Sequence, residues 1–231
     1  MCRRVKGTLR RMKVNEIFYS LQGEGKYTGT AAVFLRLSGC NMRCWFCDTE
    51  HEEGTEMTEE EITERVSQYP ARHIVITGGE PTMQLNGKLT QLLHERGFYI
   101  QIETNGSLPL KEDTLVDWIT CSPKGNEIRI QRIDELKLLF TEEYLEKYKE
   151  VEASCRCLQA IDNGNDTQGK PCYDTEQSSY DTGLQPYDTP SATETSNLKP
   201  QTSNLNEVIS YIKEHPEWRL SLQTHKLIGI E

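Results

Sequence analysis

Short apolar runs alternate with helical patterns along most of the chain, and this alternation restricts the possible fold more than any other feature. Each run is rich in aliphatic or β-branched residues and is bounded by Gly, Pro or polar residues, which is typical of a β-strand. Strands that alternate with helices indicate a mostly parallel sheet with helices outside it, either an open sheet or part of a barrel. The predicted strands span residues 16–20, 32–38, 73–77, 98–103, 118–122, 136–140, 155–158 and 219–224.

The helical segments carry recognisable start and stop signals. Thr58 and Glu61 have the spacing of a capping box, which begins a helix. Two later segments place leucine or isoleucine at helical spacing and end before Gly97 and Pro216. In sheets of this kind ligands bind at the carboxyl ends of the strands, so the functional residues are expected there.

Two segments fall outside the alternation. Residues 1–11 are basic and lack the apolar run of a signal peptide, so we expect a flexible extension ahead of a core domain at 12–231. Residues 163–204 repeat Tyr-Asp-Thr three times and contain only two large aliphatic side chains, Leu184 and Leu198. So few apolar groups cannot offset the entropy of ordering the segment, which predicts a disordered low-complexity insertion within the core domain.

Charge and composition exclude several classes of function. The 26 Lys and Arg residues against 36 Asp and Glu residues give a net charge of −10, opposite in sign to a nucleic-acid-binding surface. No apolar stretch approaches the ~20 residues that cross a bilayer, which argues against a membrane protein. Without an export signal the chain is expected in the cytoplasm, where its eight cysteines stay reduced.

Three of the cysteines form a close group directly after the second predicted strand. Cys40, Cys44 and Cys47 have the pattern C-x3-C-x2-C. Three thiolates on one loop can hold three irons of a cubane cluster and leave the fourth iron for an external ligand. With His51 the same thiolates could instead form a tetrahedral zinc site, and they could also be inert thiols. Spacing alone leaves these three alternatives open.

A second motif follows the next strand. Residues 73–77 run into Gly78, Gly79, Glu80 and Pro81, where the glycines allow close backbone approach and the proline ends the strand. Together with the cysteine pattern, this motif resembles the radical S-adenosylmethionine (SAM) enzymes. Six further segments resemble the 7-carboxy-7-deazaguanine synthases within that superfamily: YSLQGEG at 19–25, CDT at 47–49, ETNG at 103–106, SPK at 122–124, LQAID at 158–162 and LQTHK at 222–226.

The resemblance implies a lyase of queuosine and 7-deazapurine biosynthesis. That family converts 6-carboxy-5,6,7,8-tetrahydropterin to 7-carboxy-7-deazaguanine with loss of ammonia, on a partial, modified (β6/α3) TIM-like radical SAM core. The implied cofactors are one 4Fe–4S cluster, SAM and Mg²⁺. The implied partners are the pterin substrate, a flavodoxin- or ferredoxin-type electron donor and a second copy in a homodimer. The alternatives are a glycyl-radical-enzyme activase of the same superfamily and a non-catalytic Cys3His zinc-binding module.

The resemblance also assigns roles to residues of this sequence. The cluster ligands are Cys40, Cys44 and Cys47, and Thr49 is the Mg²⁺ ligand. The substrate contacts are Leu21, Gln22, Gly23, Arg36, Thr77 and the α-carboxylate of Glu231. Glu103 and His225 are candidates for acid–base catalysis. The SAM contacts are Phe46, Cys47, Asp48, Gly79, Ser122, Pro123, Lys124, Gln159, Ala160, Ile161 and Asp162, although Ala160 stands where the family more often has proline.

Arg36 can be placed by strand geometry as well. It lies four residues before Cys40 on the same predicted strand, so its side chain can point toward the cysteine loop. A planar guanidinium there can pair with the substrate carboxylate through two hydrogen bonds. An ion pair within the fold is the alternative that the sequence leaves open.

Overall fold

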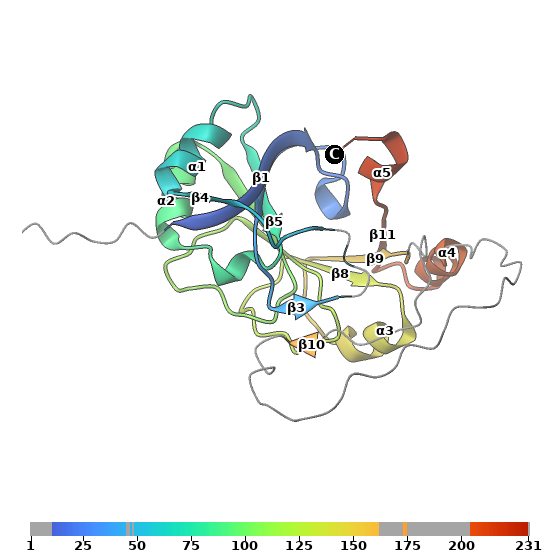
Figure 1. Ribbon diagram of the computed structural model, residues 1–231. Coiled ribbons are helices and arrows are strands. Elements are labelled where there is room, and N and C mark those ends of the chain that lie inside the picture. The colour runs from blue at the N-terminus through green and yellow to red at the C-terminus, as the bar shows by residue number, and fades with distance from the viewer. Residues whose placement is uncertain (1–10, 45–46, 48, 162–172, 175–203, 231) are drawn as a thin grey trace, which may run out of the picture.

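The computed structural model describes residues 11–44, 47, 49–161, 173–174 and 204–230. Its main element is a nine-stranded sheet with the order β11-β9-β8-β7-β6-β5-β2-β1-β4 (Figure 1). Every neighbouring pair from β2 to β11 is parallel, and β1 is antiparallel to both β2 and β4. The strands are β1 Met12–Leu21, β2 Ala31–Leu37, β4 Thr55–Met57, β5 His73–Gly78, β6 Tyr99–Thr104, β7 Trp118–Cys121, β8 Glu135–Leu139, β9 Cys155–Gln159 and β11 Arg219–Ser221.

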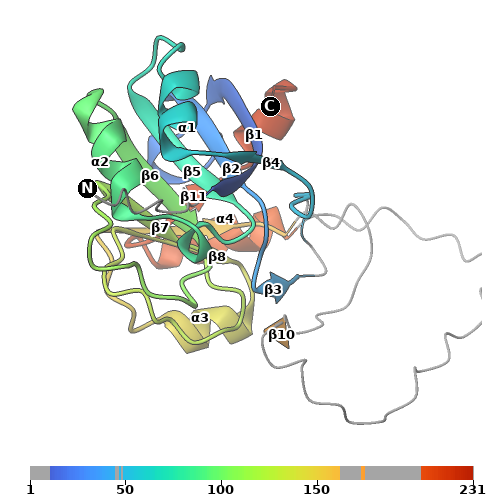
Figure 2. The same ribbon diagram turned by 60° about the vertical axis from the view of Figure 1, so that its left-hand side comes forward.

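A separate two-stranded ribbon joins β3 (Met42–Arg43), which lies in the cysteine loop, to β10 (Tyr173–Asp174). Figure 2 shows this ribbon apart from the main sheet. The predicted extension at 1–11 and the predicted insertion at 163–204 otherwise lie almost entirely outside the described residues.

The five helices of the described chain follow the strand order. They are α1 Glu59–Val66, α2 Gly87–Glu95, α3 Glu142–Tyr148, α4 Leu205–Glu214 and α5 Thr224–Ile228, with short 3-10 turns η1 Gly25–Tyr27 and η2 Pro81–Met83. The capping box before α1 is confirmed: the Glu61 N–H donates to Thr58 Oγ1 at 3.2 Å, and the Thr58 N–H donates to Glu61 Oε2 at 2.7 Å. The connections β6–β7 and β7–β8 contain no helix, so the fold is a mostly parallel α/β core with reduced crossovers, as predicted.

The two ends of the sheet differ from the sequence-based strands. β1 begins at Met12 rather than residue 16, because Met12 and Val14 are buried in the core while polar residues between them interrupt the apolar pattern. At the other end β11 stops at Ser221, and Thr224 begins α5 instead of extending the strand.

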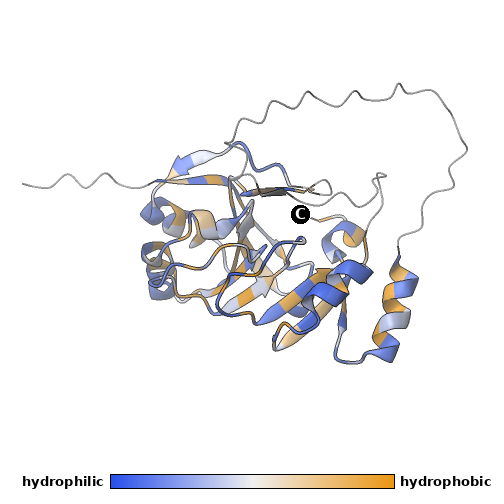
Figure 3. Cartoon of the chain, turned by 90° about the horizontal axis from the view of Figure 1, so that it is seen from below, coloured by the Kyte–Doolittle hydropathy of each residue, from blue (hydrophilic) through white to orange (hydrophobic). Residues whose placement is uncertain are grey.

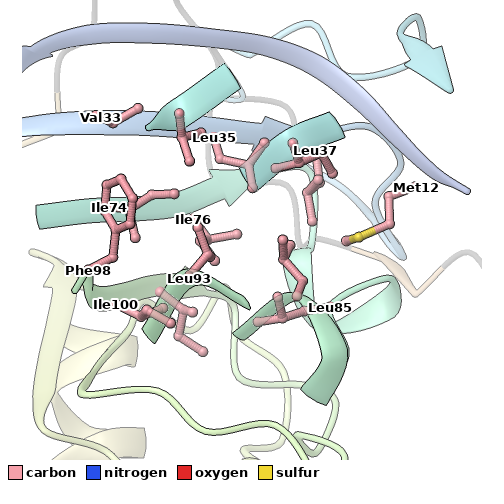
Figure 4. Packing of buried hydrophobic residues seen from close by; sticks show 14 of the residues in the cluster. Met12, Val33, Leu35, Leu37, Ile74, Ile76, Leu85, Leu93, Phe98 and Ile100 are labelled. Carbon is pink, nitrogen blue, oxygen red and sulfur yellow. The ribbon is translucent and has the colours of Figure 1, made fainter. Parts of the chain in front are cut away.

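The two faces of the sheet have different environments. Alternate residues of β2, β5 and β6 pack under α1 and α2, as Figure 4 shows for Leu35, Ile76 and Ile100. On β8 and β9 the same face packs against Val208 of α4 and Tyr148 of α3. The helices accordingly carry apolar residues on one side, visible as orange bands between blue ones in Figure 3. We call this the outer face, and the opposite surface, which carries most of the polar side chains described below, the inner face.

Candidate active site

The GGEP motif at the end of β5 lies directly against the cysteine loop. The Gly79 N–H donates to the Leu37 carbonyl at 2.9 Å, and the Glu80 N–H donates to the Gly39 carbonyl at 2.8 Å. A Cβ on Gly79 would lie 1.9 Å from the Gly39 oxygen, so no other residue fits without moving the loop. Gly78 has φ +118°, a conformation that favours glycine.

Glu80 connects this motif to the end of β6. Its side chain is fully buried, and burial raises its pKa although four hydrogen bonds favour the anion. Oε1 accepts from the Thr82 N–H at 3.0 Å, the Thr82 hydroxyl at 2.6 Å and the Thr104 hydroxyl at 2.7 Å. Oε2 accepts from the Asn105 N–H at 2.8 Å. The carboxylate therefore fixes the ETNG segment relative to GGEP.

The ETNG segment in turn holds the cysteine loop through Asn41. Asn105 Nδ2 donates to Asn41 Oδ1 at 3.1 Å, and Asn41 Nδ2 donates to Ser107 Oγ at 2.8 Å. Asn126, just after the SPK segment, donates to the Asn105 carbonyl at 3.1 Å. The GGEP motif, the ETNG motif and the cysteine loop thus meet in one hydrogen-bond network at the carboxyl ends of the strands, and Asn126 joins it from beyond the SPK segment.

The predicted cluster ligands lie on this anchored loop. Cys40 is partly buried, and burial raises the pKa of its thiol to about 11. Cys44 is also partly buried, whereas Cys47 is exposed, and none of the three belongs to a disulfide. No three His, Cys, Asp or Glu side chains of the described chain converge on a point where one metal ion could bind.

The two metal interpretations require different spacings of the thiols. A single tetrahedral zinc needs its sulfurs within about 3.8 Å of one another, because zinc–sulfur bonds are about 2.3 Å long. Cys40, Cys44, Cys47 and His51 do not form such a set in the described structure. A cubane cluster accepts a wider spread, since each thiolate binds a different iron. Three thiols on one loop are the ligand set of a cluster whose fourth iron binds an external group.

His51 adds a second observation at the base of the loop. Its carbonyl accepts the Gly39 N–H at 2.7 Å, whereas its buried Nδ1 has no hydrogen-bond partner in the described structure. Buried polar atoms normally have partners. An orphaned nitrogen at this position fits a loop that encloses a group with acceptor atoms.

The predicted substrate residues form a row across the inner face. Arg36 on β2 pairs with Thr77 on β5 in the parallel register. Ile76 pairs with Ile102, so Glu103 on β6 follows at the level of Thr77. Neighbouring residues in a parallel register point to the same face. The structure thus brings Arg36, Thr77 and Glu103 together beside the cysteine loop.

Arg36 also makes the ion pair that strand geometry left open. Its Nη1 lies 3.0 Å from Glu16 Oε1 on the neighbouring β1, and its guanidinium lies over the Phe18 ring at 5.2 Å. The side chain remains 32% exposed. Since a guanidinium carries five N–H donors, this pair leaves donors for a ligand on the inner face.

Gln22 and Glu103 are joined to two charged residues that the sequence did not single out. Gln22 Nε2 donates to Glu103 Oε1 at 2.9 Å. Lys137 Nζ, on β8, donates to Glu103 Oε2 at 2.8 Å and to Glu24 Oε2 at 2.5 Å. Gln159 approaches the same group, with Nε2 at 3.5 Å from Glu24 Oε1. Charged residues are seldom fully buried unless they are paired. The position of Lys137 inside the apolar run of β8 was therefore the sequence signal for a buried ion pair.

The amino ends of the strands are closed by aromatic side chains. The Tyr27 and Tyr99 hydroxyls lie 2.8 Å apart, and Tyr27 contacts the His73 and Trp118 rings edge to face. Buried Cys155 and Cys157 pack in the same cluster. The inner face therefore opens toward the carboxyl ends, where the motifs lie.

The segment around η1 is held by the other end of the sheet. The Gly25 N–H donates to Ser221 Oγ at 3.0 Å, and the Thr224 N–H donates to the Gly23 carbonyl at 2.9 Å. A Cβ on Gly23 would lie 2.2 Å from His225 Nδ1, so the candidate His225 is in close contact with a predicted substrate residue. Leu21, at the end of β1, is 38% exposed.

The predicted SAM contacts that the structure describes also lie at carboxyl ends. Ser122 N–H donates to the Thr104 carbonyl at 2.8 Å, and Lys124 Nζ donates to Ser122 Oγ at 2.9 Å. Gln159 is buried at the end of β9, followed by Ala160 and Ile161. Thr49 lies two residues after Cys47, whose thiol contacts the Thr49 carbonyl at 3.5 Å. Phe46, Asp48, Asp162 and Glu231 lie outside the described residues.

No helix in the described part of the chain is both long and apolar enough to cross a membrane.

Known proteins share these features along nearly the whole chain. Residues 35–153 match the Radical SAM superfamily. A 7-carboxy-7-deazaguanine synthase of Bacteroides thetaiotaomicron is 44% identical over 219 residues, covering 94% of this chain and 98% of that protein. A protein of the same name from Bordetella pertussis is 34% identical over 242 residues, with the same two coverages. The crystal structure of QueE from Escherichia coli is 25% identical with a TM-score of 0.64, covering 93% of this chain and 95% of that one.

Proposed function

This chain belongs to the 7-carboxy-7-deazaguanine synthases of the Radical SAM superfamily, and from that membership we propose that it converts 6-carboxy-5,6,7,8-tetrahydropterin to 7-carboxy-7-deazaguanine. It is an enzyme and a lyase. Loss of one ammonia accounts for every atom that the product lacks, so the reaction consumes no net oxidant or reductant. The relatives favour neither a glycyl-radical-enzyme activase nor a zinc-binding module.

One observation supports the inner face as the substrate site. Arg36, Thr77 and Glu103 share one row on three neighbouring strands, and Gln22 is hydrogen-bonded to Glu103 at 2.9 Å. These residues come from widely separated parts of the sequence. The row lies beside the loop that carries the three thiols, as a reaction at a bound substrate requires.

The side chains match the chemistry of the substrate. The pterin has a carboxylate at one end, for which the Arg36 guanidinium is a suitable partner. Its other end is an amino-pyrimidine edge with several N–H donors, for which the Glu103 carboxylate and the Gln22 amide carbonyl are suitable acceptors. The aromatic cluster around Tyr27 closes the far end of the face and excludes water from it.

The cofactors extend this proposal to the loop. The three thiols would hold a 4Fe–4S cluster, and Gly79, the SPK segment and the end of β9 would hold SAM, all at the same edge of the sheet. When bound, cluster and SAM supply the carbon-centred radical that starts the reaction. Thr49 would contribute one oxygen ligand to Mg²⁺, which accepts substrate oxygens and waters for the rest of its shell.

The remaining roles rest on the family alone. We include a flavodoxin- or ferredoxin-type electron donor, a cytoplasmic location and a homodimer in the proposal. Glu103 and His225 remain the acid–base candidates, and the Glu231 carboxylate remains a candidate for the pterin edge.

The direct test is an anaerobic turnover assay with the carboxytetrahydropterin, SAM, Mg²⁺ and a reductant. We expect the deazaguanine chromophore to accumulate with ammonia at equal yield and without net loss of SAM. Replacing Arg36 with Gln should raise KM for the pterin about 10- to 100-fold, the value of a hydrogen-bonded charge pair. The matched change Arg96→Gln removes a surface ion pair on α2 and should leave KM unchanged. Reconstituted wild-type protein that holds its cluster but forms no chromophore would refute the proposal.

A further inference from the structure

Lys137 is a buried cation on the inner face with two carboxylate partners. Its side chain is 5% exposed, and the side chains of Glu24 and Glu103 are 16% and 19% exposed. Glu24 lies in the loop before η1, Glu103 on β6 and Lys137 on β8. The contact therefore joins the middle of the sheet to the loop after β1. No sequence motif pointed to Lys137.

The charge states follow from this arrangement. Burial lowers the pKa of Lys137, but the charges of Glu103 and Glu24 outweigh it, and its pKa lies above the ordinary value. Burial raises the pKa of Glu24, but the charge of Lys137 and hydrogen bonds from Lys137 and Gln223 outweigh burial, and the pKa lies below the ordinary value. The ion pair of Lys137 and Glu24 thus favours the charged form of both groups.

The geometry connects Lys137 to the substrate row without placing it there. Both Glu103 oxygens are held, Oε1 by Gln22 and Oε2 by Lys137. Each carboxylate oxygen accepts more than one hydrogen bond, so both still have lone pairs for donors on a ligand. Lys137 thus fixes the orientation of Glu103 through its hydrogen bond to Oε2.

We propose that Lys137 is a positioning residue for the pterin: it pairs with Glu103 and Glu24 and fixes the orientation of both carboxylates, so that the substrate's N–H edge meets two fixed acceptors. This role rests on the function proposed above. It gives a physical reason for burying a lysine where a leucine would pack as well, because two carboxylates without a cation in a buried site retain a proton.

Other ionisable groups lie close to Lys137 and its two carboxylate partners, and they influence the effect of replacing Lys137. Glu135 lies two residues before Lys137 on β8, and burial raises its pKa. Cys157 faces Lys137 on β9, and burial raises its pKa also. His225 acts on Glu24 electrostatically from α5.

The test compares Lys137→Met, which keeps the length and removes the charge, with Lys137→Arg, which keeps the charge. kcat and KM for the pterin are measured from pH 6 to 9, roughly the range around neutrality in which an uncompensated carboxylate pair titrates. We expect kcat/KM of Lys137→Met to fall about 10- to 100-fold, with an acid limb shifted upward by about one pH unit or more. Lys137→Arg should recover the wild-type pH profile. Lys88→Met removes a surface lysine paired with Glu60 and should change neither quantity.

A second measurement works without turnover. Infrared difference spectra of Lys137→Met should show a protonated carboxyl band at neutral pH, which disappears in the double variant with Glu103→Gln or in that with Glu24→Gln. A Lys137→Met protein with an unchanged pH profile and no such band would overturn the proposal. If wild-type protein shows no turnover, the proposed function fails, while the infrared result still decides the charge state of the carboxylates.

Discussion

Replacing Glu80 with Gln tests whether one buried carboxylate holds the motifs together. Four hydrogen bonds converge on Glu80, and two of their donors are the backbone N–H groups of Thr82 and Asn105. A glutamine carbonyl can take the place of Oε1 and keep the Thr82 and Thr104 donors. Its amide group then faces the Asn105 N–H, donor against donor.

The magnitude follows from that mismatch. One charge-assisted hydrogen bond is lost and buried donors are left unpaired, at a cost of about 2–4 kcal/mol. The neutral amide avoids the burial penalty that raises the pKa of Glu80, which offsets part of this cost. We expect a net loss of about 1–3 kcal/mol in the free energy of unfolding. The difference in unfolding free energy between wild type and Glu80→Gln should increase as the pH is lowered. Glu80 has a folded-state pKa above its unfolded value, so wild-type protein gains stability as the pH falls through that folded-state pKa. The glutamine of the Glu80→Gln variant cannot take up this proton.

Urea unfolding of the reduced, cluster-free protein measures this loss, and hydrogen exchange of residues 39–44 reports whether the cysteine loop loosens with it. Glu61→Gln is the matched control, since a glutamine preserves the capping box before α1. A stability of Glu80→Gln within about 0.5 kcal/mol of wild type, at the level of an ordinary surface change, would refute the reasoning.

Three further predictions concern the loop and the charged group. Cys44→Ala should abolish turnover and reduce the iron content of reconstituted protein, measured by iron and sulfide analysis, because one cluster ligand is removed. Gly79→Ala should disrupt cluster assembly, since its Cβ meets loop backbone at 1.9 Å, whereas Gly97→Ala meets nothing within 4 Å and should cost only the strain of its positive φ, about 1–2 kcal/mol in urea unfolding. Stability should fall as pH drops below about 4.3, the ordinary glutamate value, because the lowered pKa of Glu24 contributes stability only above it, and Lys137→Met should flatten this part of the pH–stability curve.

The sequence predicted those parts of the fold in which a local pattern is enough. Short apolar runs located the parallel strands, and the capping box of Thr58 and Glu61 located α1. The first four residues of β1 were missed, because Met12 and Val14 are buried partly through pairing with β4, which lies more than 40 residues later. The helix α5 was not predicted, and its first residue, Thr224, was assigned to the preceding strand, since five residues are too few for a helical period to show.

The candidate site was predictable where a motif carries it. The cysteine loop, GGEP and the row of Arg36, Thr77 and Glu103 were all named from the sequence, and the structure brings them to one edge of the sheet. Lys137 was not named, and Glu24 appeared only as one residue of a motif without a role of its own, because their importance lies in a contact between residues 113 positions apart. The ion pair of Arg36 with Glu16 was left open for the same reason, since it depends on the register of β1 against β2.

The contact between the loop after β1 and the end of β11 has a consequence for biosynthesis. The Gly25 N–H finds Ser221 Oγ 196 residues later, and Gly23 is held by Thr224. A ribosome that adds about 5–20 residues per second leaves these early groups without their partners for roughly 10–40 s. During that interval the nascent chain can assemble the part of its outer apolar layer that lies under α1 and α2. Residues 23–25 therefore reach their final contacts only after β11 and the start of α5 have been translated.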